Sequence, residues 1–313
     1  MSEAARVDDL AAAIARLEPR LGPLRGEPQV LGGGMTNRNV RVRLGEGDYV
    51  VRLCGIGAEA VSVDRETEQL AQRAAHAAGI APAVVARLVA DGGLACDVLV
   101  TQFASGPALT AAQVREPAML SQIAAALRVL HDGPLLPTSF PAFTLAHEYA
   151  ERAVARGATL DPADRELAVS LSALIRAAVG GPGHEPVPCH NDLLSANFLL
   201  DGDALQLIDW EYAGMNDRFF DLGNLAVNTE LDADDELALL RQYLGAEPAA
   251  REIAALRLMR LMSDVREALW GVVQSVSSEI EFDYRAYAEK HFARLRAASA
   301  DPRLEEWLDA ASA

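Results

Sequence analysis

The spacing of apolar residues changes once along this chain, at residues 102–107. Before that segment, short apolar runs alternate with glycine-rich turns, which is typical of antiparallel strands. After it, apolar residues recur mostly at steps of three and four, which predicts helices. Because the 313 residues exceed the usual span of one hydrophobic core, we expect two lobes, at 1–101 and 102–313.

The predicted fold class is α+β, with a small antiparallel sheet lobe and a larger, mainly helical lobe. The first lobe is expected to hold two helices and a set of strands. Its predicted helices span 4–17 and 61–78, and its predicted strands span 29–31, 40–44, 49–53, 84–89 and 94–101. The helices predicted in the second lobe span 112–130, 142–156, 162–179, 221–228, 234–244, 248–276 and 282–299.

Charge and composition exclude several classes of partner. The chain has 28 Lys and Arg against 45 Asp and Glu, a net charge of −17, whereas a nucleic-acid surface needs a basic stripe. No apolar run approaches the ~20 residues of a membrane span. The first ten residues carry four charges, so we expect no secretory signal. The three cysteines lack metal-ligand spacing and suit a reducing cytoplasm. We expect a cytoplasmic protein that binds a cationic small molecule, with no obligate protein partner evident.

One segment, residues 187–209, interrupts the helical lobe with a loop and two short strands. A hairpin centred on Gly202 pairs its strands so that Asn197 lies beside Ile208 and Asp209. Since strands in a ladder are ~4.8 Å apart, two oxygen-bearing side chains meet at one end of the hairpin. Side-chain oxygens are what a protein offers Mg²⁺ when phosphate and water fill its other positions.

Asp192 precedes Asn197 by five residues, in the pattern H-x-D-x-x-x-x-N, and can reach the same end of the hairpin. A carboxylate beside a metal pair suits phosphoryl transfer to a hydroxyl, because the carboxylate accepts the proton while the metal neutralises phosphate charge. The alternative is a hairpin whose polar ends are simply solvated.

Upstream residues complement this arrangement. The period of two in a strand places Val50 and Arg52 on one face, where Val50 can cover a base and Arg52 can bind phosphate. Glu68 on the following helix is a natural ion-pair partner for Arg52. Small residues between two strands let backbone N–H groups approach phosphates, and the candidates here are Gly33, Gly34, Met35, Thr36 and Asn37. Taken alone, that segment is only a hairpin turn.

These motifs resemble the choline/ethanolamine kinases, within the protein-kinase-like group that includes the aminoglycoside phosphotransferases. The matching segments are G-G-G-M-T-N (32–37), Y-V-V-R-L (49–53), C-H-N-D-L-L-S-A-N (189–197) and L-I-D-W-E-Y-A-G-M-N-D (207–217). The resemblance extends from about residue 29 to residue 292. It implies a two-lobed protein-kinase-like fold that binds ATP and Mg²⁺ between the lobes.

The resemblance also implies residue roles. Asp192 matches the catalytic base, and Asn197 and Asp209 match the metal ligands. Arg52 and Glu68 match a phosphate-clamping pair. The backbone of Gln102 and Ala104 matches the adenine-binding hinge, and His190 and Asp221 match residues that brace the catalytic loop.

Aromatic residues gather late in the sequence, with 11 of 17 at or after Trp210. Aromatic faces and nearby carboxylates recognise ammonium groups. Tyr212 and Trp270 match aromatic cage positions in the family, and Glu211 adds charge beside Tyr212. On the helix predicted over 248–276, one stripe holds the polar and aromatic residues and the opposite stripe forms the core face. The members of the polar stripe are Asp264, Glu267, Trp270 and Gln274, and those of the core stripe are Leu258, Leu261, Val265, Leu269, Val272 and Val276.

Two departures from the family concern the acceptor. Glu267 stands where many members carry a second Trp, and Asn228 replaces a family glutamate. These departures leave the cage with fewer aromatics and more carboxylate, which suits a primary amine as well as a trimethylammonium group. The expected substrate is choline, ethanolamine or a similar amino alcohol. A second interpretation keeps the chemistry but changes the acceptor to thiamine, an aminoglycoside or another cation. A third is a nucleotide-binding pseudokinase that serves as a sensor or scaffold.

Overall fold

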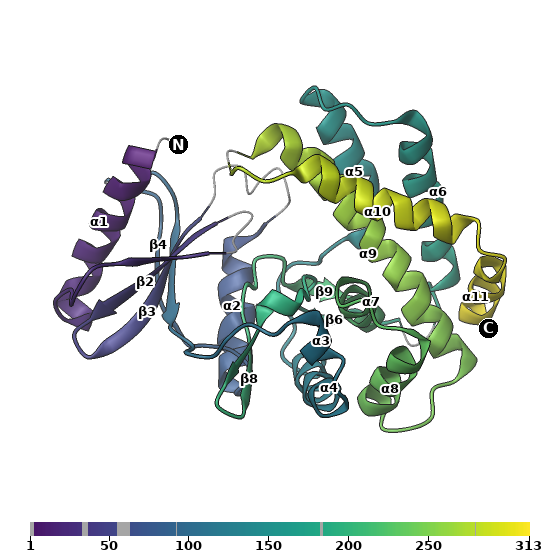
Figure 1. Ribbon diagram of the computed structural model, residues 1–313, viewed down its shortest axis with the longest axis horizontal. Helices are drawn as coiled ribbons and strands as arrows, with labels where there is room; N and C mark the ends of the chain where they lie inside the picture. Colours follow the sequence, from purple (N-terminus) through teal and green to yellow (C-terminus); the bar gives the residue numbers. More distant parts are fainter. Residues whose placement is uncertain (1–2, 33–36, 55–62, 92, 182–183, 279) are drawn as a thin grey trace.

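The structure is a computed structural model, and it describes residues 3–32, 37–54, 63–91, 93–181, 184–278 and 280–313. Figure 1 shows a small sheet with one helix on each side and, beyond the second of these helices, a larger assembly of helices. This α+β, two-part architecture confirms the predicted fold class. Gly33, Gly34, Met35 and Thr36, which were expected near phosphate, lie outside the described residues.

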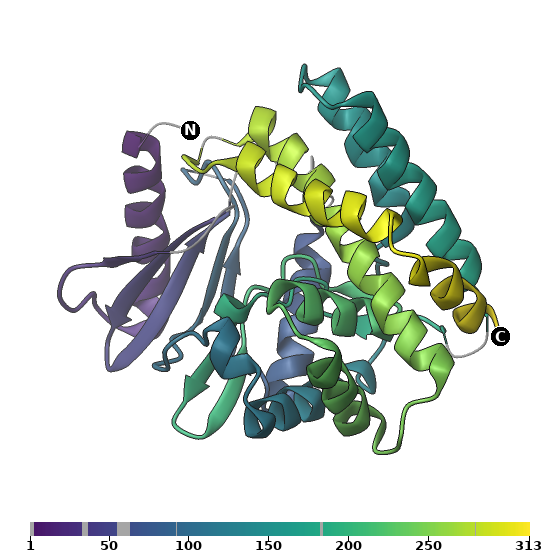
Figure 2. The same cartoon turned by 45° about the vertical axis from the view of Figure 1, so that its right-hand side comes forward.

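The sheet is antiparallel, with strands in the order β1-β2-β3-β5-β4. The strands are β1 (Gln29–Leu31), β2 (Arg38–Leu44), β3 (Gly47–Leu53), β4 (Val84–Leu88) and β5 (Val98–Gln102). Helix α1 (Glu3–Leu21) covers the face turned away from the helical part, as both views show (Figures 1 and 2). Its Ile14 and Leu17 pack with Val40, Val51 and Val100, because alternate strand residues point to that face.

Helix α2 (Arg65–Ala77) lies between the sheet and the helical part (Figure 1). It begins after Asp64, whose carboxylate accepts a hydrogen bond of 2.6 Å from the Thr67 N–H. Such a cap satisfies one of the free N–H groups of the first turn. Its buried Ala71 and Ala75 pack in the core of the helical part.

The larger part contains α3 (Ala111–Val114), α4 (Pro117–His131), α5 (Ala142–Ala155), α6 (Pro162–Ala178), α7 (Arg218–Asn228), α8 (Ala233–Leu244), α9 (Ala250–Ser277), α10 (Tyr284–Ser299) and α11 (Arg303–Ser312). The single helix predicted over 112–130 is two helices, because Pro117 occupies the first turn of α4 and lacks an N–H to continue α3. Helix α11 was not predicted, nor was the pairing of β6 (Val187–Cys189) with β9 (Gly214–Asn216).

Helix α9 confirms the predicted core stripe at Leu258, Leu261, Val265, Leu269 and Val272, and its polar stripe is buried as well. Asp264, Glu267 and Trp270 are each no more than 3% exposed. Val276, which was expected in the core, is 36% exposed. Helices α5, α7, α10 and α11 all contact α9, and its exposed residues, such as Arg251 and Val276, lie near its two ends.

The predicted hairpin is confirmed. Strands β7 (Phe198–Asp201) and β8 (Ala204–Leu207) pair Leu200 with Leu205 across a turn in which Gly202 has a φ of 63°. Gly106 lies so close to this hairpin that a Cβ atom there would come within 2.1 Å of the Leu200 carbonyl oxygen. In the part of the chain that the structure describes, no helix combines the length and apolarity that a membrane crossing needs.

Candidate active site

The buried carboxylate of Asp221 on α7 anchors the loop that follows β6. Its two oxygens accept hydrogen bonds from the N–H groups of His190 and Asn191, at 2.8 and 2.7 Å. His131 Nε2 lies 3.1 Å from the same carboxylate. Asn191 adopts a φ of 66°, an uncommon left-handed conformation that these bonds help to maintain. The loop therefore leaves β6 in a fixed direction.

A second anchor holds the next residues of the loop. The Leu193 N–H donates to Oδ1 of Asn224, whose Nδ2 donates in turn to Ser263 Oγ at 2.9 Å. The Asn191 side chain donates to the Tyr212 carbonyl at 3.0 Å. Asp192 thus lies between two residues whose backbones are bound to helix α7.

Replacing Asp221 with alanine is expected to lower the free energy of unfolding by about 3–5 kcal/mol, because it leaves two buried N–H groups unpaired and empties the site beside His131. Urea denaturation followed by circular dichroism measures the loss. Asp203→Ala, in the exposed turn of the β7–β8 hairpin, is the control and should stay within about 0.5 kcal/mol of the parent. A loss of similar size in both variants would contradict the bracing role.

Asp192 is 8% exposed, and its Oδ1 accepts a hydrogen bond of 3.2 Å from Nη1 of Arg266 on α9. Burial raises the pKa of the Asp192 carboxyl, which the Arg266 guanidinium partly offsets. Asn197 Nδ2 donates to the backbone carbonyl of Asp192 at 2.8 Å. That bond orients the amide, so its oxygen Oδ1 is the atom left to serve as an acceptor.

Asp209 lies at the end of the hairpin beside Asn197, as predicted from the strand pairing. The Ile208 N–H donates to the Asn197 carbonyl at 3.0 Å, and Asp209 follows with a φ of 66°. Its carboxylate accepts from Arg52 Nη1 at 2.9 Å, and its side chain remains 29% exposed. Burial and the nearby Glu211 raise the pKa of Asp209, while Arg52 lowers it.

Arg52 on β3 also forms an ion pair with Glu68 on α2, as the sequence predicted. Both side chains are almost fully buried. Arg65, which the sequence analysis did not single out, donates to Glu68 at 3.0 Å and to Glu211 at 3.3 Å. Two arginine-carboxylate contacts, Arg52 with Asp209 and Arg65 with Glu211, therefore join the sheet lobe to the segment that follows the hairpin.

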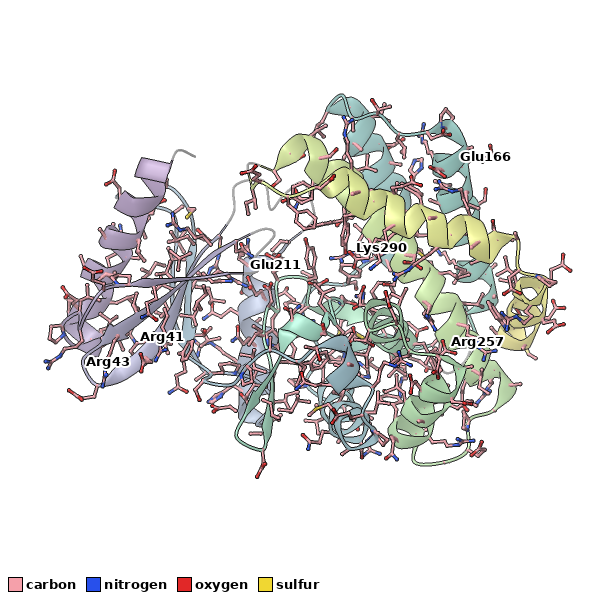
Figure 3. All side chains as sticks on the ribbon, viewed as in Figure 1. Arg41, Arg43, Glu166, Glu211, Arg257 and Lys290 are labelled. Atoms are coloured by element: carbon pink, nitrogen blue, oxygen red, sulfur yellow. The ribbon has the colours of Figure 1, made fainter. Side chains whose placement is uncertain are left out.

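Glu211 was expected to face the acceptor, and the structure binds its carboxylate to the sheet lobe. Its Oε2 accepts from Asn37 Nδ2 at 2.8 Å and from Arg65. Figure 3 shows Glu211 between the sheet and the helical part. Glu211 and Asn37, assigned to acceptor and nucleotide respectively, thus form one contact across the two lobes.

Tyr212 and Trp270 come together, as expected for cage positions. Trp270 Nε1 donates to the Tyr212 hydroxyl at 2.8 Å, and the Trp270 ring meets the edge of Tyr287 with centroids 5.7 Å apart. Glu267 accepts from the Tyr287 hydroxyl at 2.7 Å and from Arg266. A polar and aromatic cluster therefore adjoins Asp192 through Arg266.

Asp264 does not join this cluster. Its carboxylate accepts from His291 Nδ1 at 2.6 Å, and Arg294 lies 3.4 Å away, both on α10. It borders a hollow of about 640 Å³ that Arg257 and Trp307 also line. In Figure 3, Arg257 lies across the helical part from Glu211. Asp264 and Glu267 both face α10, as their helical spacing suggests, but only Glu267 also contacts Arg266 beside Asp192.

The segment expected to form the hinge continues from β5. The Gln102 N–H donates to the Ala83 carbonyl at 2.9 Å, and the Phe103 N–H donates to the Asp48 carbonyl at 3.0 Å. Val50 on β3 pairs with Thr101 on β5 and is half-buried. Ala104 follows Phe103 and is also half-buried.

The side chains around Asp209 fit a hard divalent cation. Asn197 and Asp209 present amide and carboxylate oxygens at one end of one hairpin, and oxygen donors are what Mg²⁺ prefers. Burial raises the pKa of Asp192 and Asp209 most, and repulsion from neighbouring carboxylates, Glu211 among them, raises both further. A bound cation relieves that repulsion.

A small antiparallel sheet joined to a helical lobe, with a braced carboxylate loop and an oxygen-donor hairpin between them, defines a phosphotransferase of the protein-kinase-like fold. The model of the phosphotransferase enzyme family (APH) matches residues 27–256, and the chain belongs to that family.

Similar proteins narrow the class to kinases that act on an alcohol. Rat ethanolamine kinase 2 is 29% identical over 308 residues, which cover 89% of this chain and 78% of the rat protein. A choline/ethanolamine kinase family protein from Mesorhizobium loti is 30% identical, with a TM-score of 0.80 over 97% of this chain and 99% of that one. Choline kinase LicA from Streptococcus pneumoniae is 23% identical, with a TM-score of 0.71 over 92% and 97% of the two chains. The predicted resemblance is confirmed, and the chain is a choline/ethanolamine kinase-like phosphotransferase.

Proposed function

We propose that this enzyme uses ATP and Mg²⁺ to phosphorylate the hydroxyl of a small amino alcohol of the choline and ethanolamine type. The main support for this proposal is that Asp192, Asn197 and Asp209 lie together at one end of the β7–β8 hairpin. Arg52 forms a hydrogen bond to Asp209 at the same place. The rat relative is named as an ethanolamine kinase, and that name supports this class of acceptor.

Asp192 is the proposed general base. It accepts the proton of the acceptor hydroxyl as that oxygen attacks the γ-phosphorus, and it orients the attacking oxygen. The hydrogen bond from Arg266 and the braced loop limit the movement of the carboxylate. Positioning of this kind accounts for much of the catalysis in phosphoryl transfer.

Asn197 and Asp209 are the residues that would hold Mg²⁺. When bound, the ion supplies positive charge against the β- and γ-phosphates. Arg52 is proposed to bind phosphate as well, because its forked guanidinium suits phosphate oxygens and Glu68 holds it in place. If phosphate replaced Asp209 as the partner of Arg52, both oxygens of the Asp209 carboxylate would be free to bind the cation.

The nucleotide base is proposed to lie against Val50 and the backbone of Gln102 and Ala104. Since the Gln102 N–H is already bonded to Ala83, its carbonyl is the group available to a base amine. The backbone N–H groups of residues 33–37 are proposed to approach the phosphates.

The acceptor is proposed to contact Tyr212, Glu267 and Trp270, with Glu211, which is bonded to Asn37 and Arg65 of the sheet lobe, closing the site. Asp264 is left out of this set because it borders the hollow that Arg257 and Trp307 line, and its partners are His291 and Arg294 rather than Arg266.

An assay of ADP release with choline, ethanolamine, thiamine and an aminoglycoside tests the proposal. Turnover that depends on an amino alcohol and on Mg²⁺ is the expected result. If only thiamine or the aminoglycoside were phosphorylated, that compound would be the acceptor and the amino-alcohol proposal would be wrong. Stabilisation against heat by nucleotide, without turnover on any acceptor, would identify a pseudokinase instead.

Arg52→Lys is expected to reduce kcat/KM for ATP by roughly 10–100-fold. Lysine keeps the positive charge but lacks the planar guanidinium whose several N–H donors can bind Glu68 and phosphate at the same time. The KM for the acceptor should change little, since Arg52 lies on the sheet lobe. Steady-state kinetics with each substrate varied separately measure the two effects. Arg43→Lys, at an exposed position of β2, is the matched control. Equal loss in both variants, or a loss confined to acceptor KM, would contradict the clamp.

A further inference from the structure

A hollow of about 640 Å³ lies between helices α8, α9, α10 and α11, and the proposed phosphoryl transfer does not use it. Arg257, which lines it, lies across the helical part from Glu211 in Figure 3. Ligand sites in proteins usually have volumes of about 300–1,000 Å³. The hollow is therefore large enough for a small molecule, and its side chains indicate which kind.

Arginines gather at this hollow although the chain as a whole carries a net charge of −17. Four of the described residues that line it are arginines, namely Arg257, Arg260, Arg294 and Arg303. The first three side chains are 23%, 26% and 26% exposed, so a solute can reach their guanidinium groups. Guanidinium groups bind phosphate oxygens through two parallel N–H donors. The hollow is thus accessible to an anion and has the side chains that bind one.

Two of these arginines share a single buried carboxylate. Arg257 Nε donates to Glu236 at 3.2 Å, and Arg260 Nη1 donates to Glu236 and to the Leu231 carbonyl. Within the described part of the chain, the other nitrogens of both guanidinium groups have no hydrogen-bond partner. One carboxylate offsets only one of the two positive charges. A positive charge and unused N–H donors therefore remain at the hollow, where a phosphate group can pair with them.

The described carboxylates that line the hollow fall into two groups. Glu236 and Asp264 are buried, and Asp301 accepts a hydrogen bond of 2.6 Å from an arginine of the hollow. Glu230 and Asp232 precede α8 and have exposed side chains. Their ion pairs are weak because they are exposed, so these two carboxylates can also bind the ammonium group of a ligand. Unused arginine donors and exposed carboxylates together fit a zwitterion that carries a phosphate and an ammonium group.

One side of α10 connects the hollow to the proposed acceptor site. Arg294 lies 3.4 Å from Oδ1 of Asp264, and His291 Nδ1 lies 2.6 Å from the same oxygen. The His291 and Tyr287 rings have centroids 4.6 Å apart, and the Tyr287 hydroxyl donates to Glu267 at 2.7 Å. The three α10 residues recur at steps of four and three, which places them on one side of the helix. A ligand bound to Arg294 is therefore joined to the acceptor site by a continuous series of contacts.

We propose that the hollow binds the phosphate ester of an amino alcohol and that the bound ester lowers turnover. This inference rests on the proposed function, since such an ester is the product of the proposed reaction. The phosphate pairs with the unused donors of Arg257 and Arg260, and the ammonium group pairs with Glu230 or Asp232.

The effect on turnover follows from Arg294. A phosphate in the hollow competes with Asp264 for this side chain, which weakens the contact between α9 and α10. Asp264 lies one helical turn from Glu267, whose bond to Arg266 helps to hold the proposed base, Asp192. Weaker packing at that turn leaves the base less often in its productive position, and positioning accounts for much of the catalysis in phosphoryl transfer.

Isothermal titration calorimetry with O-phosphoethanolamine, phosphocholine and inorganic phosphate tests the site. The parent enzyme should bind at least one ester more tightly than inorganic phosphate, which lacks the ammonium group. Arg257→Gln should weaken ester binding by roughly 10–100-fold, because it removes charge-assisted hydrogen bonds. Arg251→Gln, at an exposed position in the first turn of the same helix, is the matched control and should bind like the parent.

A second variant separates the two ends of the ligand. Glu230→Gln, on an exposed side chain, should weaken ester binding by roughly 2–5-fold and leave the affinity for inorganic phosphate unchanged. Thermal unfolding establishes that each variant is folded. Glu230→Gln remains informative if Arg257→Gln does not fold.

Initial rates of ADP release at saturating ATP and acceptor test the effect on turnover. Saturating ester should lower the parent rate by roughly fivefold or more, which is a usual size of coupling between two sites. The same ester should leave the rate of Arg257→Gln largely unchanged. Without ester, Arg257→Gln should keep the parent kcat and KM, because Arg257 lies outside the proposed catalytic and binding residues.

The outcomes separate this inference from the function beneath it. Equal ester affinity in the parent and Arg257→Gln would overturn the inference and leave the kinase function standing. Equal inhibition of both enzymes would place the ester in the active site, and inorganic phosphate bound as tightly as the esters would show an anion site only. Either result would overturn the inference as well. ADP release with none of the acceptors would overturn the proposed function and, with it, the regulation by product.

Discussion

Asp192→Asn is expected to lower kcat by roughly 10²–10⁴-fold, the usual contribution of a positioned general base. Asparagine preserves the size of the side chain and still offers an oxygen to Arg266 Nη1, so the loop should keep its shape. The amide cannot accept the proton of an attacking hydroxyl at neutral pH. The KM for ATP should stay within about threefold, because Asp192 contributes to the chemical step rather than to nucleotide binding.

ADP release at saturating ATP and acceptor measures this effect, with Asp203→Asn in the exposed hairpin turn as the matched control. The control should retain the parent rate. Full activity in Asp192→Asn would refute the assignment of the base.

Asp209→Asn is expected to reduce kcat by roughly 10²–10⁴-fold at low Mg²⁺, since charge neutralisation by a metal contributes several kcal/mol in the transition state. The Mg²⁺ concentration for half-maximal rate should rise, because an amide is a weaker ligand for a hard cation than a carboxylate. Partial recovery at high Mg²⁺ distinguishes a lost ligand from a damaged fold.

A Mg²⁺ titration of the rate provides the measurement. Asp201→Asn, at the turn end of the same hairpin, is the control and should leave the titration curve unchanged. An unchanged Mg²⁺ requirement in Asp209→Asn would remove Asp209 from the proposed metal site.

The part of the site that could be predicted from the sequence lies within one local hairpin. The Leu200–Leu205 pairing follows from a short turn with glycine, and it places Asn197 beside Ile208. Strand alternation likewise placed Arg52 within reach of Glu68 on the next helix. These relations depend on backbone geometry over a few residues, which sequence patterns express directly.

The remaining contacts depend on tertiary packing that no local pattern expresses. Arg65 meets Glu211 across 146 positions of sequence, and Arg266 meets Asp192 across 74. The spacing of α9 residues placed Asp264 and Glu267 on one stripe, and both do face α10, but only Glu267 also contacts Arg266 beside Asp192. A helix surrounded by other helices has no solvated face, so its periodicity does not separate core residues from site residues.

A crystal structure with Mg²⁺ and a non-hydrolysable ATP analogue tests the central claim most directly. We predict that Asn197 Oδ1 and a carboxylate oxygen of Asp209 lie about 2.0–2.1 Å from a Mg²⁺ ion that also contacts the triphosphate. The Asp192 carboxylate should face the γ-phosphate from the acceptor side. Asn197 and Asp209 both turned away from the bound triphosphate would contradict the kinase mechanism proposed for this site.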